Sequence, residues 1–544
     1  MASILAENRA KLYSLLAENR AEIQVVRRAT KCCVRCAMRY AEVRDPAAYQ
    51  LSEEELEAAI ADDPEADADA TTATDSTAVA TDVSVSGNSG AVCPLCLGCL
   101  QHCVRPEAVS AVAEVVRSSG HEMREFALVV SVPVQVLLRE RGGWLNLQRA
   151  RAASAAVLGG GFSSIAPTRG GAPPAARGNV GQPRYDKIVD LKEALRWSMA
   201  PALSHELGVP CEGSSPLLVH VSLSHAGSAG EHHDIVSKLL PPENAHQKRK
   251  RWNNNQPTEY DSIRTVSRAL AMERADNLIS SSRMCPPPNP TSACLVTVNV
   301  ERSNVTLTGR YCKYSRQLPQ SPWILDGSRK AQGSVQECIT EIVLPLYGAA
   351  EGRFHSAGRE DVDVRMLGNG RPFTLELVGP KRPWHDAAAL ARAVEEVNAC
   401  GLIEIDGLTE CDLSRMSEVM KEGEEGHRKE YRCCVILSRA LAAADVAMLN
   451  GTTELVCQQL TPMRVLHRRT LMVRERTIHS MRAVLLSPKM LQLDLTTQAG
   501  TYVKEFVHGD FGRTTPTLGA LLNCSADIMQ LDVMGLQDMP HKQV

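Results

Sequence analysis

The sequence predicts an α+β protein of several domains, and three observations support this. The chain has 544 residues, more than one hydrophobic core usually organises. Strand-like and helix-like runs alternate from about residue 305 to the end. Cysteine pairs near the N-terminus mark a separate module. We therefore expect a helix and cysteine module at 1–105, a mixed accessory region at 106–304 and an α/β or α+β domain at 305–544.

Composition and charge narrow the class of protein. No apolar run reaches the roughly 18–20 residues of a membrane helix. Charged residues interrupt positions 1–28, which argues against a secretory signal peptide. Residues 45–104 hold 12 acidic residues and no Lys or Arg, so with a total of −3 the rest of the chain carries +9. That basic body is compatible with a polyanionic partner.

Two helices and an acidic insert are expected in the N-terminal module. The hexapeptide at 5–10 returns at 16–21, eleven residues or three helical turns later, so 1–28 should form an amphipathic docking helix. Ser52 followed by Glu55 forms a capping box that opens a helix over 52–61. Residues 62–90, rich in Asp, Ala, Thr and Ser, should be disordered or loosely helical.

Two CxxC pairs suggest a metal site. The pairs are Cys33 with Cys36 and Cys93 with Cys96, 56 residues apart. Four thiolates suit a closed, structural Zn²⁺ site without a catalytic role. The alternative is a small core of reduced cysteines. With 18 cysteines and no secretory signal, we expect a reducing compartment and no disulfides.

The accessory region has weaker signals. Residues 129–136 and 217–223 are strand candidates, and 152–183, rich in Gly, Ala, Pro, Ser and Arg, should be a flexible loop. The basic cluster at 248–251 could be a nuclear address, an RNA contact or a solvated loop.

The C-terminal domain has clearer signals, although spacing gives no topology. We expect a hairpin over 295–308 and a turn at 367–370 before a strand at 373–377. The expected helices are 334–347 and 384–398, and the other expected strands are 432–437, 471–478 and 491–497.

A basic stretch lies at 464–482. It includes Arg464, His467, Arg468 and Arg469 and only one acidic residue. Arginines of this density suit phosphate oxygens, so the stretch should bind nucleic acid in a salt-dependent manner. The alternative is a solvated strand face.

Two shorter motifs could carry chemistry. Asp361 and Asp363 would share a face in extended chain, and on these grounds alone they could be a metal site, an acid/base pair or a turn. On a strand Tyr502 and Lys504 would also share a face, where a ring could stack on a base and a cation could pair with a carboxylate. The alternative is a buried strand with a surface lysine.

Together these motifs resemble one family. The run 358–361, Gly-Arg-Glu-Asp, is similar to the GRxD signature of pseudouridine synthases, and 500–504, Gly-Thr-Tyr-Val-Lys, resembles their GTYxR/K element. The strings at 309–323, 358–376, 464–469 and 496–514 closely resemble the archaeal and eukaryotic tRNA pseudouridine synthases counted as the tenth family. The resemblance implies an α+β catalytic domain with a mixed, largely antiparallel sheet, and an N-terminal zinc-binding, THUMP-containing α/β domain.

The resemblance also implies roles for individual residues. Asp361 would be the nucleophile that attacks uracil C6 or ribose C1′, Lys504 its basic partner, and Arg359 a helper that fills the vacated position or holds phosphate. Tyr431 and Tyr502 would contact the base. No cofactor is required for this isomerisation, and Zn²⁺ would be structural.

RNA contacts and partners follow from the same resemblance. A forefinger-like loop at 321–334 would carry Arg329 and Lys330, and a thumb-like loop at 459–474 would carry Arg464, His467, Arg468 and Arg469. The substrate would be the T arm of tRNA, at position 54, 55 or both. The alternative is an RNA-binding scaffold that acts without catalysis, for example with primary microRNA and its processing machinery. We expect a monomer in the nucleus and cytoplasm, with the mitochondrion as an alternative, and no membrane contact.

Overall fold

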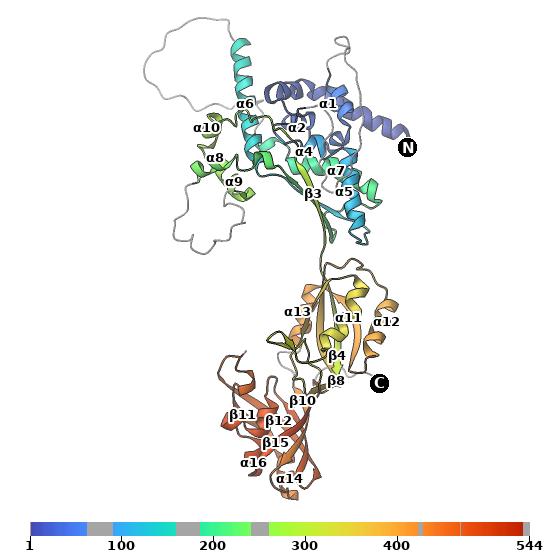
Figure 1. The fold of residues 1–544 in the computed structure, drawn as a ribbon, viewed down its shortest axis with the longest axis vertical. Coiled ribbons are helices and arrows are strands. Elements are labelled where there is room, and N and C mark those ends of the chain that lie inside the picture. Colours follow the sequence, from blue (N-terminus) through green and yellow to red (C-terminus); the bar gives the residue numbers. More distant parts are fainter. Residues whose placement is uncertain are drawn as a thin grey trace, which may run out of the picture. The chain divides into compact units, whose positions relative to one another are not determined.

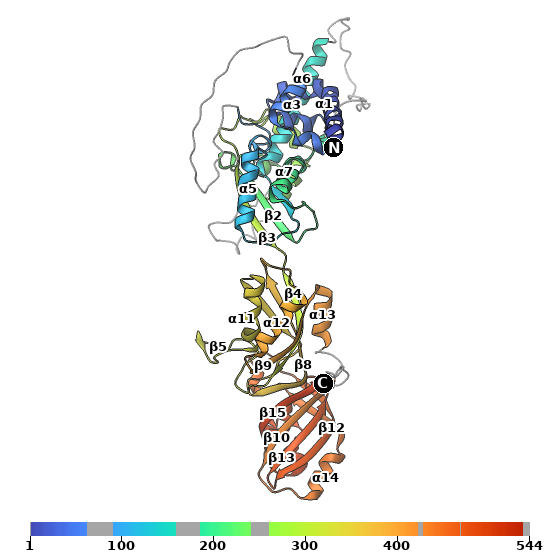
Figure 2. The same ribbon diagram turned by 90° about the vertical axis from the view of Figure 1, so that its right-hand side faces the viewer.

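The chain forms two compact units, Met1–Glu301 and Arg302–Val544 (Figures 1 and 2). The computed structural model describes residues 2–61, 91–158, 185–240, 261–422, 428–467 and 469–536. The expected acidic insert at 62–90, the basic cluster at 248–251 and Arg468 lie outside these residues.

The N-terminal unit is mostly helical around one small sheet. Residues from both expected N-terminal regions contribute to a single core, in which Leu16, Cys96, Leu195 and Val219 are all fully buried. Its helices are α1 (Ala2–Thr30), α2 (Val34–Tyr40), α3 (Glu53–Ile60), α4 (Cys99–His102), α5 (Pro106–Ser118), α6 (Gln135–Leu158), α7 (Leu191–Leu207), α8 (His233–Leu239), α9 (Ile263–Leu270) and α10 (Ala275–Ser280).

The first two helical predictions are confirmed. α1 covers the expected N-terminal helix. α3 begins after Ser52, whose hydroxyl accepts from Glu55 N, while the Glu55 carboxylate accepts from Ser52 N, so both halves of the capping box are present.

The small sheet has the order β1 (Ala127–Ser131), β2 (Leu217–Ser224) and β3 (Leu295–Arg302). β2 confirms the strand expected at 217–223. The strand expected at 129–136 is wrong in its second half, because the chain leaves the sheet at Ser131 and enters α6 at Gln135. α6 also continues to Leu158, so the loop expected from 152 begins later, and the rest of it lies outside the described residues.

The C-terminal unit is built on one large mixed sheet. Its order is β14-β11-β12-β13-β10-β15-β8-β4-β9, and β7 pairs with β8. The pairs are antiparallel except β15 with β8, which run parallel. Its strands are β4 (Val305–Lys313), β7 (Glu351–Ser356), β8 (Val364–Val378), β9 (Ile403–Cys411), β10 (Lys429–Leu437), β11 (Thr453–Leu460), β12 (Val473–Ser487), β13 (Met490–Thr497), β14 (Thr514–Thr515) and β15 (Ala526–Leu536).

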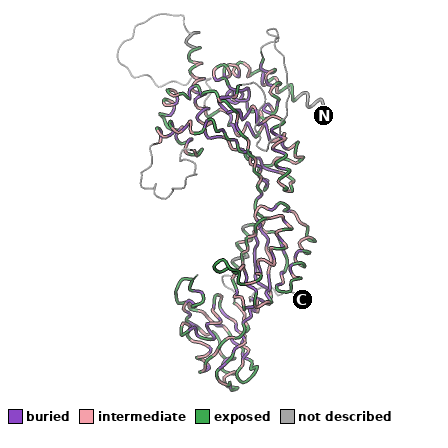
Figure 3. The backbone as a smooth tube through the Cα atoms, in the orientation of Figure 1, coloured by how far each residue is buried: buried purple, intermediate pink, exposed green. Residues whose placement is uncertain are grey.

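Helices cover this sheet and close its core. Figure 2 shows α11 and α13 on opposite sides of β4. Buried residues follow the strands of the sheet (Figure 3). The helices are α11 (Val335–Tyr347), α12 (Ala387–Asn398), α13 (Leu413–Glu422), α14 (Ala443–Gly451), α15 (Val503–His508) and α16 (Leu518–Leu522), and a separate two-stranded hairpin joins β5 (Ile324–Leu325) to β6 (Ser328–Arg329). Among the described helices, none is long and apolar enough to cross a membrane.

The expected helices and strands of this unit are found with changed limits. α11 and β13 agree with expectation, whereas α12 begins at Ala387, after the N-cap Asp386, and β12 runs from Val473 to Ser487. The turn expected at 367–370 is instead an irregularity inside the 15-residue strand β8. Gly368 and Gly370 have φ values of +66° and +71°, which favour glycine.

The hairpin expected at 295–308 is wrong. β3 and β4 follow each other directly, but β3 belongs to the small sheet and β4 to the large one. The apolar alternation of both strands is real, but it reflects burial against two different cores rather than mutual pairing. The break between the two units falls beside this point, at Glu301 and Arg302.

Candidate functional site

The turn that carries Asp361 joins β7 to β8, and a buried network of hydrogen bonds holds it in place. Glu360 is 5% exposed and accepts from Arg371 Nε at 2.9 Å and from the Tyr311 hydroxyl at 2.9 Å. Gln320 donates to the Tyr311 hydroxyl at 2.7 Å and to Gly358 O at 3.1 Å. Gly358 has a φ of +99°, and an added Cβ would collide with the Arg371 guanidinium.

A buried lysine holds the same turn from the strand beside it. Lys313, at the end of β4, has no exposed surface, and its Nζ donates to Leu318 O, Asp361 O and Val362 O at 2.8, 3.0 and 2.9 Å. All three of its N–H groups can therefore be satisfied by carbonyl oxygens. Burial lowers the pKa of Lys313 to about 8, although neighbouring carboxylates, Glu360 first, act in the opposite direction.

The Asp361 carboxylate points to two cations. Its Oδ2 lies 2.7 Å from Arg464 Nη1 and 3.4 Å from Lys504 Nζ. Lys504 donates to both oxygens of Asp363 at 2.8 and 2.7 Å. The Asp361–Asp363 segment forms a turn rather than a strand, yet both carboxylates reach the same ammonium group. Burial acts to raise the pKa of Asp363, but the hydrogen bond and charge of Lys504 outweigh it, so this pKa is lowered.

Arg464 is itself anchored by a buried acid. Its Nε donates to Glu505 Oε1 at 2.7 Å, and the Glu505 side chain is 2% exposed. Burial disfavours the charged guanidinium, but Glu505 and then Asp361 more than compensate, and the pKa of Arg464 is raised. The sequence assigned Arg464 to an RNA-binding stretch. In the structure it contacts the predicted nucleophile, Asp361.

Tyr502 and Lys504 lie at the start of a helix and not on a strand. Tyr502 is the N-cap of α15, and Lys504 is in its first turn. The fully buried Gln459 accepts from Tyr502 N and donates to Tyr502 O, both at 2.9 Å, so two hydrogen bonds fix the helix start. This orientation brings Lys504 to the aspartates, as the resemblance implied.

Tyr431 lies on β10 and is partly buried against the core of the unit. Burial raises its pKa to about 12, with the charge of Arg371 acting in the opposite direction. Tyr431 therefore interacts electrostatically with Arg371, the residue that also pairs with Glu360.

A cavity of about 230 Å³ opens beside Asp361. Arg359, His467 and Trp323 line it, so the predicted helper Arg359 and one predicted substrate contact, His467, meet the predicted nucleophile there. Tyr431, Tyr502 and Lys504 are not among its lining residues. The cavity is lined by Pro319, Gln320, Trp323, Arg359, Glu360, Asp361, Val362 and His467.

The other predicted RNA contacts lie on exposed segments. Arg329 is in the β5–β6 hairpin, where it pairs with Glu337, and Lys330 follows it on the surface. Arg469 is exposed between Arg464 and β12. The basic stretch is therefore a short 3-10 turn at Met463–Val465, a loop and a strand, and not one continuous strand face.

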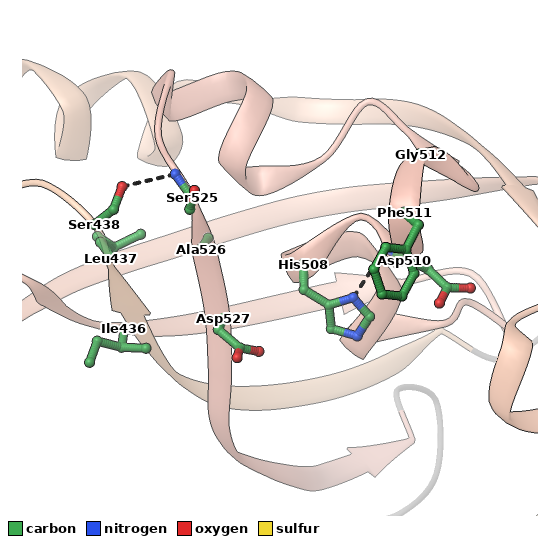
Figure 4. Close-up of a pocket in the computed structure, with 10 residues that line it drawn as sticks. All are labelled: Ile436, Leu437, Ser438, His508, Asp510, Phe511, Gly512, Ser525, Ala526 and Asp527. Carbon is green, nitrogen blue, oxygen red and sulfur yellow. Dashed lines mark hydrogen bonds between the residues drawn. The ribbon is translucent and has the colours of Figure 1, made fainter.

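A larger cavity, of about 660 Å³, lies where β10 ends and β15 begins (Figure 4). None of the predicted site residues lines it. His508, Asp510, Ser525 and Asp527 face it, and the Phe511 ring is 95% exposed. Its carboxylates make it a poor place for a phosphate backbone.

The cysteine pairs meet as expected in the N-terminal unit. The sulfurs of Cys33, Cys36, Cys93 and Cys96 are buried and lie within 4.8 Å of one another. This donor set fits a metal ion of the Zn²⁺ type. The buried Arg35, between the first two cysteines, donates to carbonyl oxygens of the segments that surround the site, Tyr49 O, Leu51 O and Leu100 O.

Several supporting residues had not been singled out from the sequence. Glu360, Arg371, Tyr311 and Lys313 are buried polar groups that only the fold brings together. All four stand inside the strings at 309–323 and 358–376 that carried the family resemblance. Their position within those strings was therefore the signal from which these residues could have been found.

Comparison with known proteins covers nearly the whole chain. The family model described as "Pus10, C-terminal" matches residues 306–537, and "Eukaryotic Pus10, N-terminal" matches residues 93–160 and 179–301. A mouse protein named tRNA pseudouridine synthase Pus10 is 37% identical over 450 residues, 81% of this chain and 78% of its own. The chain belongs to the Pus10 family.

Other relatives agree with this membership. A Xenopus laevis tRNA pseudouridine synthase Pus10 is 33% identical over 520 residues, 92% of this chain and 94% of its own. A solved Cbf5-Nop10-Gar1 complex matches 42% of this chain and 48% of that chain at 14% identity and a TM-score of 0.24, too low to add to the argument. All described residues of the Asp361 site lie in the part matched by the Pus10 C-terminal model.

Proposed function

We propose that this Pus10-family chain is a tRNA pseudouridine synthase, an isomerase, with Asp361 as its nucleophile. The observation that supports this most directly is the position of the Asp361 carboxylate. It lies at the edge of a cavity, 2.7 Å from Arg464 Nη1 and 3.4 Å from Lys504 Nζ. The two cations hold the carboxylate that would act as the nucleophile.

The proposed reaction needs only the chain's own groups. The Asp361 carboxylate attacks uracil C6 or ribose C1′, the N1–C1′ bond breaks, the base rotates, and C5 bonds to C1′. The bond to Asp361 then breaks, C5 loses its proton, and N1 takes up a proton, so that the product is an isomer of the substrate. The target uridine must first be flipped out of its stack. Arg359 and His467 line the cavity and could hold the flipped nucleotide or fill its vacated place. Tyr431 and Tyr502 would contact the base.

The substrate would be the T arm of tRNA, at position 54, position 55 or both. Support for a tRNA substrate comes from relatives named tRNA pseudouridine synthase Pus10 and from exposed cations around the site. Arg329 and Lys330 on the β5–β6 hairpin and Arg469 after the Arg464 turn lie on exposed segments that could bind phosphates, and Arg468 would join them.

Zinc would be structural in this scheme. Cys33, Cys36, Cys93 and Cys96 would hold it, and a four-thiolate site leaves no position for substrate. The surrounding accessory domain, of THUMP type by resemblance, would help to bind tRNA. A monomer in the nucleus and cytoplasm remains our prediction.

The test is pseudouridine mapping on unmodified tRNA transcripts with the purified chain. Asp361→Asn keeps the shape but removes the charge, so we expect no product above background. Asp363→Asn is the matched control: it sits two residues away and binds the same lysine, and we expect it to retain measurable activity. Full activity of Asp361→Asn would refute the assignment. RNA binding without product from the wild-type chain would favour the scaffold alternative.

A further inference from the structure

We propose that His232, His233 and Asp261 form a second metal site, which takes Zn²⁺ or a similar divalent transition-metal ion. One ligand atom from each of these residues lies within 4.8 Å of the others. The cluster belongs to the N-terminal unit and is distinct from the four cysteines. It does not depend on the proposed enzymatic function.

The geometry directs two imidazoles at one carboxylate oxygen. Nε2 of His233 lies 2.7 Å and Nε2 of His232 lies 3.3 Å from Asp261 Oδ1. The two rings meet edge to face with centroids 4.5 Å apart. Two imidazole nitrogens and one carboxylate oxygen are a common donor set for Zn²⁺ and other first-row metals, and three ligands leave one coordination position for water.

Burial separates this cluster from an ordinary surface ion pair. The His232 side chain is fully buried, whereas His233 and Asp261 are 36% and 29% exposed. An ion could therefore enter from the side of His233 and Asp261 and be held from within by His232.

The two carboxylates that flank the histidines in sequence pair with other cations, so Asp261 is the carboxylate of this site. Glu231, next to His232, is engaged with Arg139 at 2.5 and 2.7 Å. Asp234, next to His233, is exposed and pairs with Lys238 at 2.7 Å. One carboxylate with a divalent ion gives a net +1, close to neutral for a half-buried site.

A bound ion would fasten two short helices together. His232 and His233 stand at the start of α8, and Asp261 precedes Ser262, the N-cap of α9. The helices α8, α9 and α10 have seven, eight and six residues, too few for stability alone. Their satellite core includes Ile235, Val236, Val266 and Ile279, so cross-linking α8 to α9 would stabilise this part of the unit.

Zinc stoichiometry tests the proposal on the full chain. Metal-depleted protein is equilibrated with Zn²⁺, passed through a desalting column and analysed by mass spectrometry for metal. We expect two equivalents for the wild type and one for His233→Ala and Asp261→Ala. Asp234→Ala, an adjacent and exposed carboxylate, is the matched control and should keep two.

Two further measurements separate loss of a ligand from loss of fold. In the absence of metal, His233→Ala should melt like the wild type, while added Zn²⁺ should stabilise its helical signal less. With Co²⁺, the thiolate-to-metal absorption of the cysteine site should be unchanged in His233→Ala. One equivalent in the wild type, or two in both histidine and aspartate variants, would overturn the proposal and leave a hydrogen-bonded triad.

Discussion

Residues that the sequence separates widely meet at the single carboxylate of Asp361. Arg464 lies 103 positions away and Lys504 lies 143 positions away, yet both reach its carboxylate. Arg464 is held in turn by the buried Glu505. Lys504 is shared with Asp363, so its position depends on both aspartates.

Arg464 should act on the chemical step and not only on RNA affinity. We expect Arg464→Gln to lower kcat by about 10- to 100-fold, because a charge-assisted hydrogen bond contributes about 1.5–3 kcal/mol. Single-turnover rates at saturating enzyme check this. Arg469→Gln, an exposed neighbour, should weaken RNA binding with little effect on kcat. If Arg464→Gln changed only KM, the assignment to RNA binding made from the sequence would be correct.

Lys313 should make the site sensitive to alkaline pH. With a pKa of about 8, its ammonium loses a proton as pH rises through 8, and one of three carbonyls loses its donor, so activity should fall. Lys313→Met should be less active and lack this alkaline limb. Rates measured from pH 6 to 10 decide the matter, and an unchanged limb in Lys313→Met would assign it to another group.

The lowered pKa of Lys313 should affect folding stability in the opposite direction from activity: as pH rises, stability is favoured while activity falls. The pKa of Lys313 is lower in the folded chain than its ordinary 10.5, so between pH 8 and 10.5 the unfolded chain binds more protons. This group therefore favours folding increasingly as pH rises through that range. Activity and stability should diverge above pH 8.

At the scale of elements, helix α15 positions two motif residues, because Tyr502 is its N-cap and Lys504, in its first turn, reaches Asp361 and Asp363. Its start is set by the two hydrogen bonds between Gln459 and Tyr502. β11 ends beside Gln459, so the large sheet positions the helix directly.

Removing those bonds should loosen the helix start. Gln459→Leu is similar in size but leaves Tyr502 N and O without their partner, and we expect a loss of about 1–3 kcal/mol in unfolding free energy. Chemical denaturation monitored on the chain measures this loss. A thermally stable Gln459→Leu with wild-type activity would show that water replaces the glutamine.

Elements with a local signal were predictable, and those decided by tertiary contacts were not. The Ser52 capping box and the strand at 217–223 depend on neighbouring residues and are found as expected. Tyr502 and Lys504 were expected to share a strand face, but Gln459, more than 40 positions away, makes this segment a helix start. The contact between Arg464 and Glu505 could not be predicted either, because the two residues are 41 positions apart.

At the scale of the whole molecule, two separate cores divide the chain. One is built from residues before the boundary at Glu301 and Arg302, and the other from residues after it. The sequence showed that strand-like and helix-like runs begin to alternate near residue 305. The reason for it was not visible, because the alternation of β3 and β4 is the same whether two strands pair or belong to different sheets.

Removal of zinc should therefore unfold one unit and spare the other. Chelation takes away the ion that would join α2 to the segment before α4, and structural zinc sites contribute directly to folding. Calorimetry should show the transition of residues 1–301 shifted to lower temperature or lost, with that of residues 302–544 unchanged. Cys93→Ser should have the same effect without chelator. A joint shift of both transitions would show that the units are coupled.

The four-cysteine site also joins two stretches of chain that are far apart in the sequence. The described chain is docked up to Ile60, where Gln24 donates to its carbonyl, and resumes at Ala91 beside Cys93. Substitution of any one of the four cysteines would therefore release both stretches from the metal, and not only the stretch that carries the substitution.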